Sequence, residues 1–241
     1  MIKLRVKIIS FLISINEGIF FYPKLKKVYK EIFRNKELNL AFDIGVNKGQ
    51  TVKFFKIINP KVRIVGFEPH RNIFSSLINN NFENCQFFNK GCSDKDGLLL
   101  FKENILSESS TFEDVNQNSK WLKKKETIIG LKSDKLIENS YEVETIRLGG
   151  FIHKNFNHKI IDMLKIDVEG HEIKVLKGLF PLYSKRVLRF IQIENHFDDL
   201  YENFSNEIEE LLKENGFEKE RVIKHGFGKI VDIIFKNIYY E

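Results

Sequence analysis

The chain is poor in cysteine. Its 241 residues include only Cys85 and Cys92, with six residues between them. Two cysteines cannot form a disulfide framework, and no C-x-x-C pair of the kind found in zinc sites is present. We therefore expect free thiols, and we take a reducing compartment, the cytoplasm, as the location of the protein.

Long hydrophobic runs are also missing. Near the N-terminus, Lys3, Arg5 and Lys7 precede an apolar stretch at 8–15. This stretch is too short to span a bilayer and no small-residue cleavage site follows it, so neither a transmembrane helix nor a signal peptide is expected. We expect residues 1–37 to form a helical segment that packs on the domain. An anchor at the membrane interface is the less favoured alternative.

Charge of one sign is not gathered into an obvious block. Lys and Arg number 39 against 33 Asp and Glu, which gives a net charge of +6 and a pI near 9.1, and the basic residues look scattered. An anionic glycan, lipid or nucleic acid would suit this charge, and so would a merely solvated surface. Because no basic stripe or aromatic-interleaved motif is present, we expect no nucleic-acid partner.

Internal repeats and low-complexity linkers are absent, and hydrophobic residues make up 42% of the chain, which indicates one globular domain. From residue 38 onward, short apolar runs alternate with amphipathic stretches, as in a layered α/β domain with a mostly parallel sheet. The pattern predicts strands at 38–44, 62–68, 85–90, 161–168, 187–194, 217–223 and 230–236, and helices at 50–58, 70–80, 170–178 and 205–215. The short connection "KHGFGK" predicts that the last two strands form an antiparallel hairpin.

The pattern is less regular at about 94–158, inside a domain that we place at 38–241. Strands are predicted at 98–103 and 141–148, with a Ser-rich loop, "LSESSTFED", between them. Loops on a rigid scaffold commonly carry binding groups. We therefore expect this insertion to determine substrate specificity.

The stretch "AFDIGVNKGQT" runs from a predicted strand into a glycine-rich turn and a helix. A nicotinamide site would have the pattern G-x-G-x-x-G at this place. Counted from Gly45, the second and third glycine positions hold Asn47 and Gln50. An oxidoreductase is therefore disfavoured, although it stays an alternative.

The same geometry suits a nucleoside that carries an amino acid in place of a pyrophosphate. Glu68 ends the predicted strand "RIVGFE" about 20 residues after the turn, where an acceptor for ribose hydroxyls belongs. Asp43 and Asp167 are candidate partners for the cationic sulfonium and α-amino groups of S-adenosylmethionine. We therefore expect S-adenosylmethionine to be the cofactor.

Four stretches, "FDIGVNKGQT", "GFEPH", "NKGCSDKDG" and "IDMLKIDVEGHEIKVLKG", resemble the FkbM family of S-adenosylmethionine-dependent methyltransferases over about residues 40–196. The resemblance implies a class I methyltransferase fold, which is a Rossmann-like α/β fold. Its sheet has seven mostly parallel strands, the last one antiparallel, with helices on both faces. It also implies O-methylation of sugars or other small hydroxylated molecules, often in glycan or natural-product synthesis.

The resemblance also implies a set of cofactor-binding residues. These residues all lie in or beside the quoted motifs. Ser93 and Asp94 fall where members of the family usually contact the edge of the cofactor's adenine. The set is Asp43, Gly45, Asn47, Gly49, Thr51, Glu68, Pro69, Ser93, Asp94 and Asp167. One departure from the family pattern is at Leu148, which is followed by Gly149 and Gly150 where the family commonly has an acid.

Methyl transfer to an alcohol requires a general base near the carboxyl ends of the central strands. The candidates are Glu169 and His171 in "KIDVEGHE", and Glu194 and His196 in "IQIENH". Strand alternation predicts that Lys165, Asp167 and Glu169 share one face. A solvated position is an equally good interpretation of His171 and of His196.

A divalent metal is a further alternative. Asp167 at one strand end, with Glu194 and Asn195 at the next, offers oxygen ligands that suit Mg²⁺ or Ca²⁺. The same acids could instead bind hydroxyls of the cofactor and the substrate. The leading hypothesis is an O-methyltransferase whose acceptor is a small molecule or glycan precursor with a sugar hydroxyl. Another small hydroxylated metabolite, methylated with a metal, is the alternative.

Overall fold

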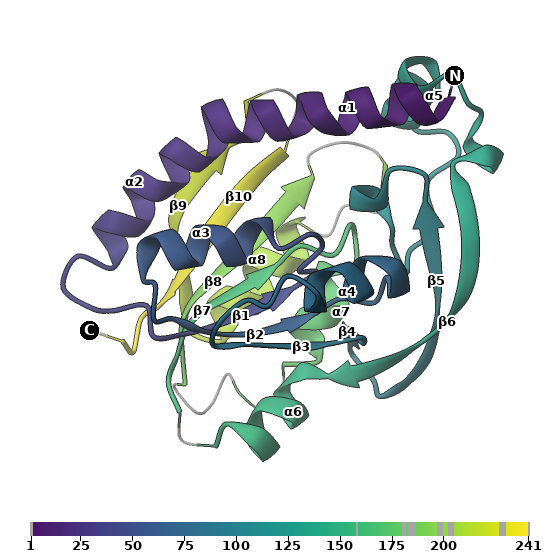
Figure 1. Cartoon of the computed structure of the whole chain (residues 1–241). Coiled ribbons are helices and arrows are strands. Elements are labelled where there is room, and N and C mark those ends of the chain that lie inside the picture. The colour runs from purple at the N-terminus through teal and green to yellow at the C-terminus, as the bar shows by residue number, and fades with distance from the viewer. Residues whose placement is uncertain are drawn as a thin grey trace.

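The main element of the protein is a seven-stranded sheet, seen edge-on at the centre of Figure 1. The computed structural model describes residues 2–157, 159–179, 182, 187–196, 200–201, 205–226 and 230–240. The strands are β1 (Leu40–Ile44), β2 (Arg63–Phe67), β3 (Cys85–Phe88), β7 (Ile161–Ile166), β8 (Leu188–His196), β9 (Phe217–Lys224) and β10 (Ile230–Asn237). Their order is β3-β2-β1-β7-β8-β10-β9.

The last strand in the chain is reversed. Neighbours from β3 to β8 pair in parallel, whereas β10 pairs antiparallel with both β8 and β9. The seven-stranded, mostly parallel sheet and the antiparallel pairing of the last two strands are confirmed. The middle of their connection, residues 227–229, lies outside the described part of the chain.

Helices cover both faces of the sheet, as expected. On one face, α2 (Tyr22–Ile32), α3 (Gln50–Ile58) and α4 (Arg71–Ile78) bury apolar side chains against Ala41, Ile64 and Met163. On the other, α6 (Leu148–Asn155), α7 (Glu172–Lys177) and α8 (Ser205–Glu214) pack on Phe42 and Ile166. Successive residues of β1 therefore pack into the apolar cores on opposite faces of the sheet, as the two-residue period of a strand requires.

The insertion forms a second, smaller sheet. Its strands are β4 (Gly91–Ser93), β5 (Gly97–Asn104) and β6 (Ile137–Arg147), in the order β4-β6-β5. The predicted strand at 98–103 corresponds to β5, but β6 begins earlier than predicted and ends before Leu148, which begins α6. The helix α5 (Lys120–Ile129) was not predicted, although Ser119 caps its start and Gly130 has the positive φ typical of a helix end.

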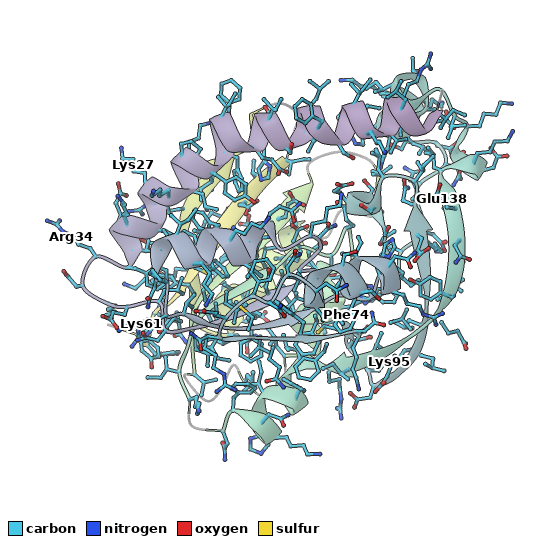
Figure 2. The ribbon with its side chains drawn as sticks, in the orientation of Figure 1. Lys27, Arg34, Lys61, Phe74, Lys95 and Glu138 are labelled. Carbon is cyan, nitrogen blue, oxygen red and sulfur yellow. The ribbon has the colours of Figure 1, made fainter. Side chains whose placement is uncertain are left out.

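Two helices precede the first strand. The π-helical turn η1 (Glu17–Phe21) joins α1 (Ile2–Asn16) to α2, and together they run along one side of the molecule (Figure 1). The buried hydroxyl of Tyr29 in α2 donates a hydrogen bond to Gln192 of β8 at 2.5 Å, which ties α2 to the sheet. Lys27 and Arg34 point away from the domain (Figure 2). Among the described residues, no helix is both long and apolar enough to cross a membrane.

We expect Gly178→Ala to destabilise the protein. A Cβ at Gly178, after α7, would overlap the backbone carbonyl oxygen of Ser93 in β4, and backbone cannot easily move away. The free energy of unfolding should fall by about 1–3 kcal/mol, measured from urea unfolding at unchanged m value. Gly150→Ala is the matched control, because a Cβ there meets nothing within 4 Å and Ala favours the helix. Equal stability of the two variants would contradict the packing argument.

Candidate active site

The glycine-rich turn after β1 has the backbone conformation that the sequence predicts. Gly45, Asn47 and Gly49 all have positive φ, at 88°, 49° and 81°. A Cβ on Gly45 would overlap the backbone carbonyl of Asp167, so only glycine lets the ends of β1 and β7 approach this closely. Asn47 tolerates the left-handed region better than other side chains do. Glycine and asparagine at these positions therefore allow the backbone conformation of the turn.

Glu68, at the end of β2, is bonded to this turn. Its Oε2 accepts a hydrogen bond from the backbone N–H of Asn47 at 2.7 Å, and its Oε1 accepts one from His70 at 2.8 Å. Burial raises the pKa of Glu68 to about 7, although both hydrogen bonds oppose the shift. Each carboxylate oxygen retains a lone pair for a further donor, such as a hydroxyl.

A cavity opens at the carboxyl ends of the central strands. Eight of the predicted site residues line it: Gly45, Asn47, Thr51, Glu68, Pro69, Asp167, Glu169 and Glu194. Two other parts of the chain add to the lining. The N-terminal segment contributes Glu17, Phe21, Tyr22 and Leu25, and the insertion contributes Phe101, Ser107, Glu108, Ser110, Thr111 and Phe112.

Some predicted residues lie outside this lining. Gly49 caps α3 and faces Phe82, and Asp94 is an exposed residue after β4. Asp43 is fully buried behind the turn, and neither of its carboxylate oxygens has a hydrogen-bond partner among the described residues. Burial raises the pKa of Asp43 to about 7, and nearby Lys165 limits the rise.

His171 and Ser93 also lie beneath the cavity wall and not on it. His171 is buried, with Nε2 2.9 Å from the Ser93 hydroxyl and Nδ1 2.5 Å from a carboxylate oxygen of Glu113. Burial alone would raise the pKa of Glu113, but hydrogen bonds from His171 and Lys174 hold it at about 2. His171 therefore connects α7 to the insertion. The side chain of His196 lies outside the described residues.

The predicted alternation along β7 is wrong beyond its last residue. The strand ends at Ile166, and Glu169 has a φ of 53° in the turn that follows, so the two-residue period no longer applies. Glu169 nevertheless lines the same cavity as Lys165 and Asp167. Its backbone carbonyl accepts a hydrogen bond from the Thr111 hydroxyl at 2.7 Å. Carboxylate oxygens of Asp167, Glu169 and Glu194 all lie within 4.8 Å of one another.

A row of polar side chains crosses the sheet beneath the cavity. Asp43 of β1, Lys165 of β7 and Gln192 of β8 are direct neighbours in register. Lys165 is buried, and its ammonium lies 2.6 Å from Asp167. Burial by itself would lower the pKa of Lys165, but Asp167, followed by Asp43, Asp232 and Glu194, holds that pKa well above its usual value.

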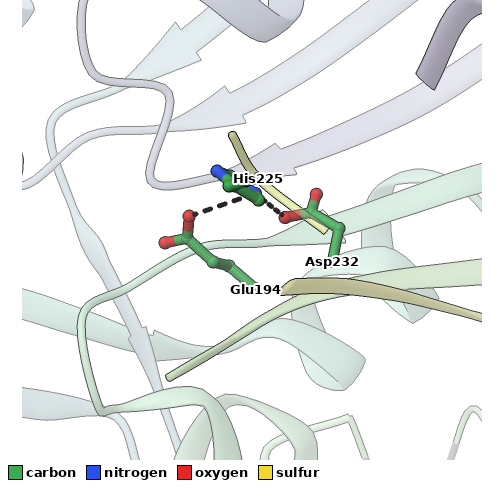
Figure 3. A group of neighbouring side chains, drawn as sticks. All are labelled: Glu194, His225 and Asp232. Carbon is green, nitrogen blue, oxygen red and sulfur yellow. Dashed lines mark hydrogen bonds and ion pairs between the residues drawn. The ribbon is translucent and has the colours of Figure 1, made fainter. Parts of the chain in front are cut away.

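Sequence reasoning missed two residues of the site, His225 and Asp232. His225 Nε2 lies 2.7 Å from Asp232 and 3.8 Å from Glu194 (Figure 3). The ring of Phe21 stacks on His225 with centroids 3.9 Å apart. The predicted hairpin of the last two strands could have indicated these two residues. Because β10 is reversed, its first residues and the residue after β9 must lie at the carboxyl edge of the other strands.

The described lining is strongly acidic. Besides His225, its ionisable charges are seven carboxylates and two lysines. The carboxylates are Glu17, Glu68, Glu108, Asp167, Glu169, Glu194 and Asp232, and the lysines are Lys90 and Lys165. Partial protonation of Glu68 leaves a clear excess of negative charge, which favours a cationic ligand.

The chain has an α/β fold with a cavity at the carboxyl ends of its parallel strands, and a sequence comparison identifies its class, a methyltransferase, and its family. The family described as the methyltransferase FkbM domain matches residues 43–219, so the chain belongs to this family. "Methyltransferase 1" of Beauveria bassiana (strain ARSEF 2860) is 30% identical over 169 residues, which are 63% of this chain and 66% of that protein. The chain thus spans just under two thirds of the length of this relative.

Solved structures give weaker likenesses. A S-adenosylmethionine-dependent methyltransferase from Aquifex aeolicus aligns over 96% of this chain and 97% of its own, with 13% identity and a TM-score of 0.48. Fibrillarin from Aeropyrum pernix, in complex with S-adenosylmethionine, aligns over 87% and 74%, with 13% identity and a TM-score of 0.46. The family is therefore assigned from the sequence match.

We expect Asp43→Asn to alter how stability depends on pH. The pKa of Asp43 is about 7 in the folded protein against 3.8 ordinarily, so the folded state binds its proton more tightly than the unfolded state. Asp43 therefore makes stability fall as pH rises from 3.8 toward about 7. The variant should lose less stability than the wild type over that range, as measured by urea unfolding without ligand. Parallel curves, with exposed Asp94→Asn as control, would refute this.

Proposed function

We propose that the chain is an O-methyltransferase that uses S-adenosylmethionine to methylate a hydroxyl of a sugar or glycan precursor. One observation carries the proposal: Glu68 and the cluster of Glu194, His225 and Asp232 line the same cavity. Glu68 suits a ribose diol, and the cluster suits removal of a hydroxyl proton. One cavity therefore offers groups for both partners of a methyl transfer.

The residues around the turn fit the cofactor. Glu68 would accept hydrogen bonds from the ribose hydroxyls, and the backbone at Gly45 and Asn47 borders the same space. The acidic lining suits a molecule with both a sulfonium and an ammonium group. The bound cofactor supplies a methyl group on sulfur that needs no activation. The protein then has to align the acceptor and remove its proton.

His225 and Asp232 support the removal of the proton. When Nε2–H of His225 donates to Asp232, Nδ1 is left unprotonated and can accept a proton. The carboxylate of Asp232 holds the ring in this tautomer and stabilises the imidazolium that forms. Glu194, at 3.8 Å from Nε2, adds a second negative charge beside the ring.

The insertion and the charge of the cavity favour a neutral acceptor. Phe101 and Phe112 line the cavity from the insertion and offer aromatic faces to the apolar side of a sugar ring. The excess of carboxylates disfavours a phosphate near the reacting hydroxyl. A sugar hydroxyl whose surroundings carry no phosphate therefore fits best.

A metal-assisted reaction is the second candidate. The carboxylates of Asp167, Glu169 and Glu194 converge within 4.8 Å, and such oxygen ligands suit Mg²⁺ or Ca²⁺. A divalent cation there would orient the acceptor hydroxyl and favour its deprotonated form. Loss of turnover on chelation, restored by Mg²⁺ or Ca²⁺, would favour this variant over a reaction that depends on His225 alone.

Glu68→Ala should abolish binding of S-adenosylmethionine. The variant loses the ribose acceptor and also the carboxylate that accepts from the N–H of Asn47. We expect micromolar binding by the wild type and at least about a hundredfold loss, measured by isothermal titration calorimetry. Glu144→Ala, an exposed change on β6, is the control and should bind normally. Wild-type protein that binds neither this ligand nor S-adenosylhomocysteine would refute the proposed cofactor.

His225→Gln should lower kcat by about 10²–10⁴ because a general base is lost, with binding of S-adenosylmethionine nearly unchanged. Transfer of labelled methyl groups to a panel of neutral sugars, with sugar phosphates for comparison, measures the effect. His153→Gln, on the exposed side of α6, is the matched control and should keep full activity. Unchanged kcat in His225→Gln would exclude His225 as the base, and transfer only to phosphorylated sugars would overturn the acceptor class.

A further inference from the structure

The helix α1 carries a stripe of exposed apolar side chains. The stripe consists of Leu4, Ile8, Phe11, Leu12 and Ile15, and a period of 3.6 residues places them within about 100° of the helix circumference. They are 64%, 50%, 63%, 58% and 39% exposed. Figure 1 shows α1 along the outer edge of the molecule, with α5 at its N-terminal end. Such a contiguous apolar surface marks an interaction site.

The opposite side of α1 is packed in part, although Ile2 and Ile13 on it are 38% and 39% exposed. Val6 and Ile9 contact the apolar cluster built around Leu106 and Leu122, which lies in the insertion. The expected packing of the N-terminal segment on the rest of the chain therefore uses only part of the helix. The stripe is left over after that packing.

The net charge of the protein lies in the same segment and is not scattered as expected. Residues 1–37 contain nine basic and three acidic residues, so they carry +6, which equals the net charge of the whole chain. Residues 38–241 contain 30 of each sign. Within α1 there is no acid, and exposed Arg5 and Lys7 stand on either side of the stripe.

A second copy of this chain is a poor occupant of the stripe. Two α1 helices packed on one another would bring together basic residues with no acid in either helix to pair with them. An anionic lipid surface matches both features, because apolar side chains enter the interface and basic ones meet the headgroups. At 15 residues, α1 can lie on a bilayer but cannot cross it.

We propose that α1 binds the surface of an anionic membrane with the stripe of Leu4, Ile8, Phe11, Leu12 and Ile15 inserted in the interface. The sequence alone disfavours an anchor at the membrane interface. The exposure of the stripe in the structure now favours it. The segment that continues from α1 lines the cavity with Glu17 and Phe21. Binding would therefore place the membrane surface on the side of the protein where the N-terminal segment covers the cavity.

Co-sedimentation with vesicles of phosphatidylcholine, with and without phosphatidylglycerol, tests the proposal on the full chain. The wild type should bind the anionic vesicles, and binding should weaken as salt is added. Phe11→Glu combined with Leu12→Glu should weaken binding at least about tenfold, because two inserted side chains are lost. Leu98→Glu with Leu100→Glu, an equally exposed pair on β5, is the control and should bind like the wild type.

Lys7→Glu gives an independent check, since it keeps the stripe and should weaken binding to anionic vesicles only. Equal binding of the wild type to both kinds of vesicle, or to neither, would overturn the proposal. So would a dimer, seen by sedimentation equilibrium, that Phe11→Glu with Leu12→Glu dissociates. Calorimetry with S-adenosylhomocysteine monitors the fold of each variant. Because it is a separate measurement, a lack of vesicle binding is distinguished from a lack of binding of the proposed cofactor.

Discussion

The buried ammonium group of Lys165 is the constraint around which the site is organised. A buried charge is costly unless other charges compensate it, and here the compensating acids come from the end of its own strand and from three other strands of the sheet. Asp43 follows from β1, Asp167 from the end of β7, Glu194 from β8 and Asp232 from β10. Three of the seven acids that make the cavity negative, Asp167, Glu194 and Asp232, thus also keep Lys165 charged.

The same row of residues links the sheet to the helices above it. Gln192, beside Lys165 in register, donates to Asp232 and accepts from the hydroxyl of Tyr29 in α2. His225 continues this chain of contacts from Asp232 to the ring of Phe21. A hydrogen-bonded network of this kind holds its members in fixed orientations only when every member is in place. The segment of η1 and α2 is therefore part of the candidate active site, whereas α1 is not.

The sequence was sufficient where a local pattern decides the structure. The turn at Gly45, Asn47 and Gly49 and the place of Glu68 beside that turn follow from residue types at fixed spacing, whereas the hydrogen bond from Asn47 to Glu68 was not predicted. The seven strands of the main sheet followed from their apolar runs, whereas β4 was not predicted. His171 shows the limit, because its position beneath the cavity depends on Glu113, a residue 58 positions away in an irregular insertion. The exposure of the stripe on α1 was equally hidden, since an apolar run looks the same whether or not something covers it.

The reversed last strand has a consequence for when the site comes into existence. The turn that suits the cofactor is complete once β1 and β2 have paired, whereas His225 and Asp232 belong to the final hairpin of the chain. The cover of the cavity comes from residues near the other terminus. During synthesis the residues of the turn are therefore made well before His225, the base proposed above. The proposed base and its partner Asp232 join the cavity only when β10 has paired with β8 and β9.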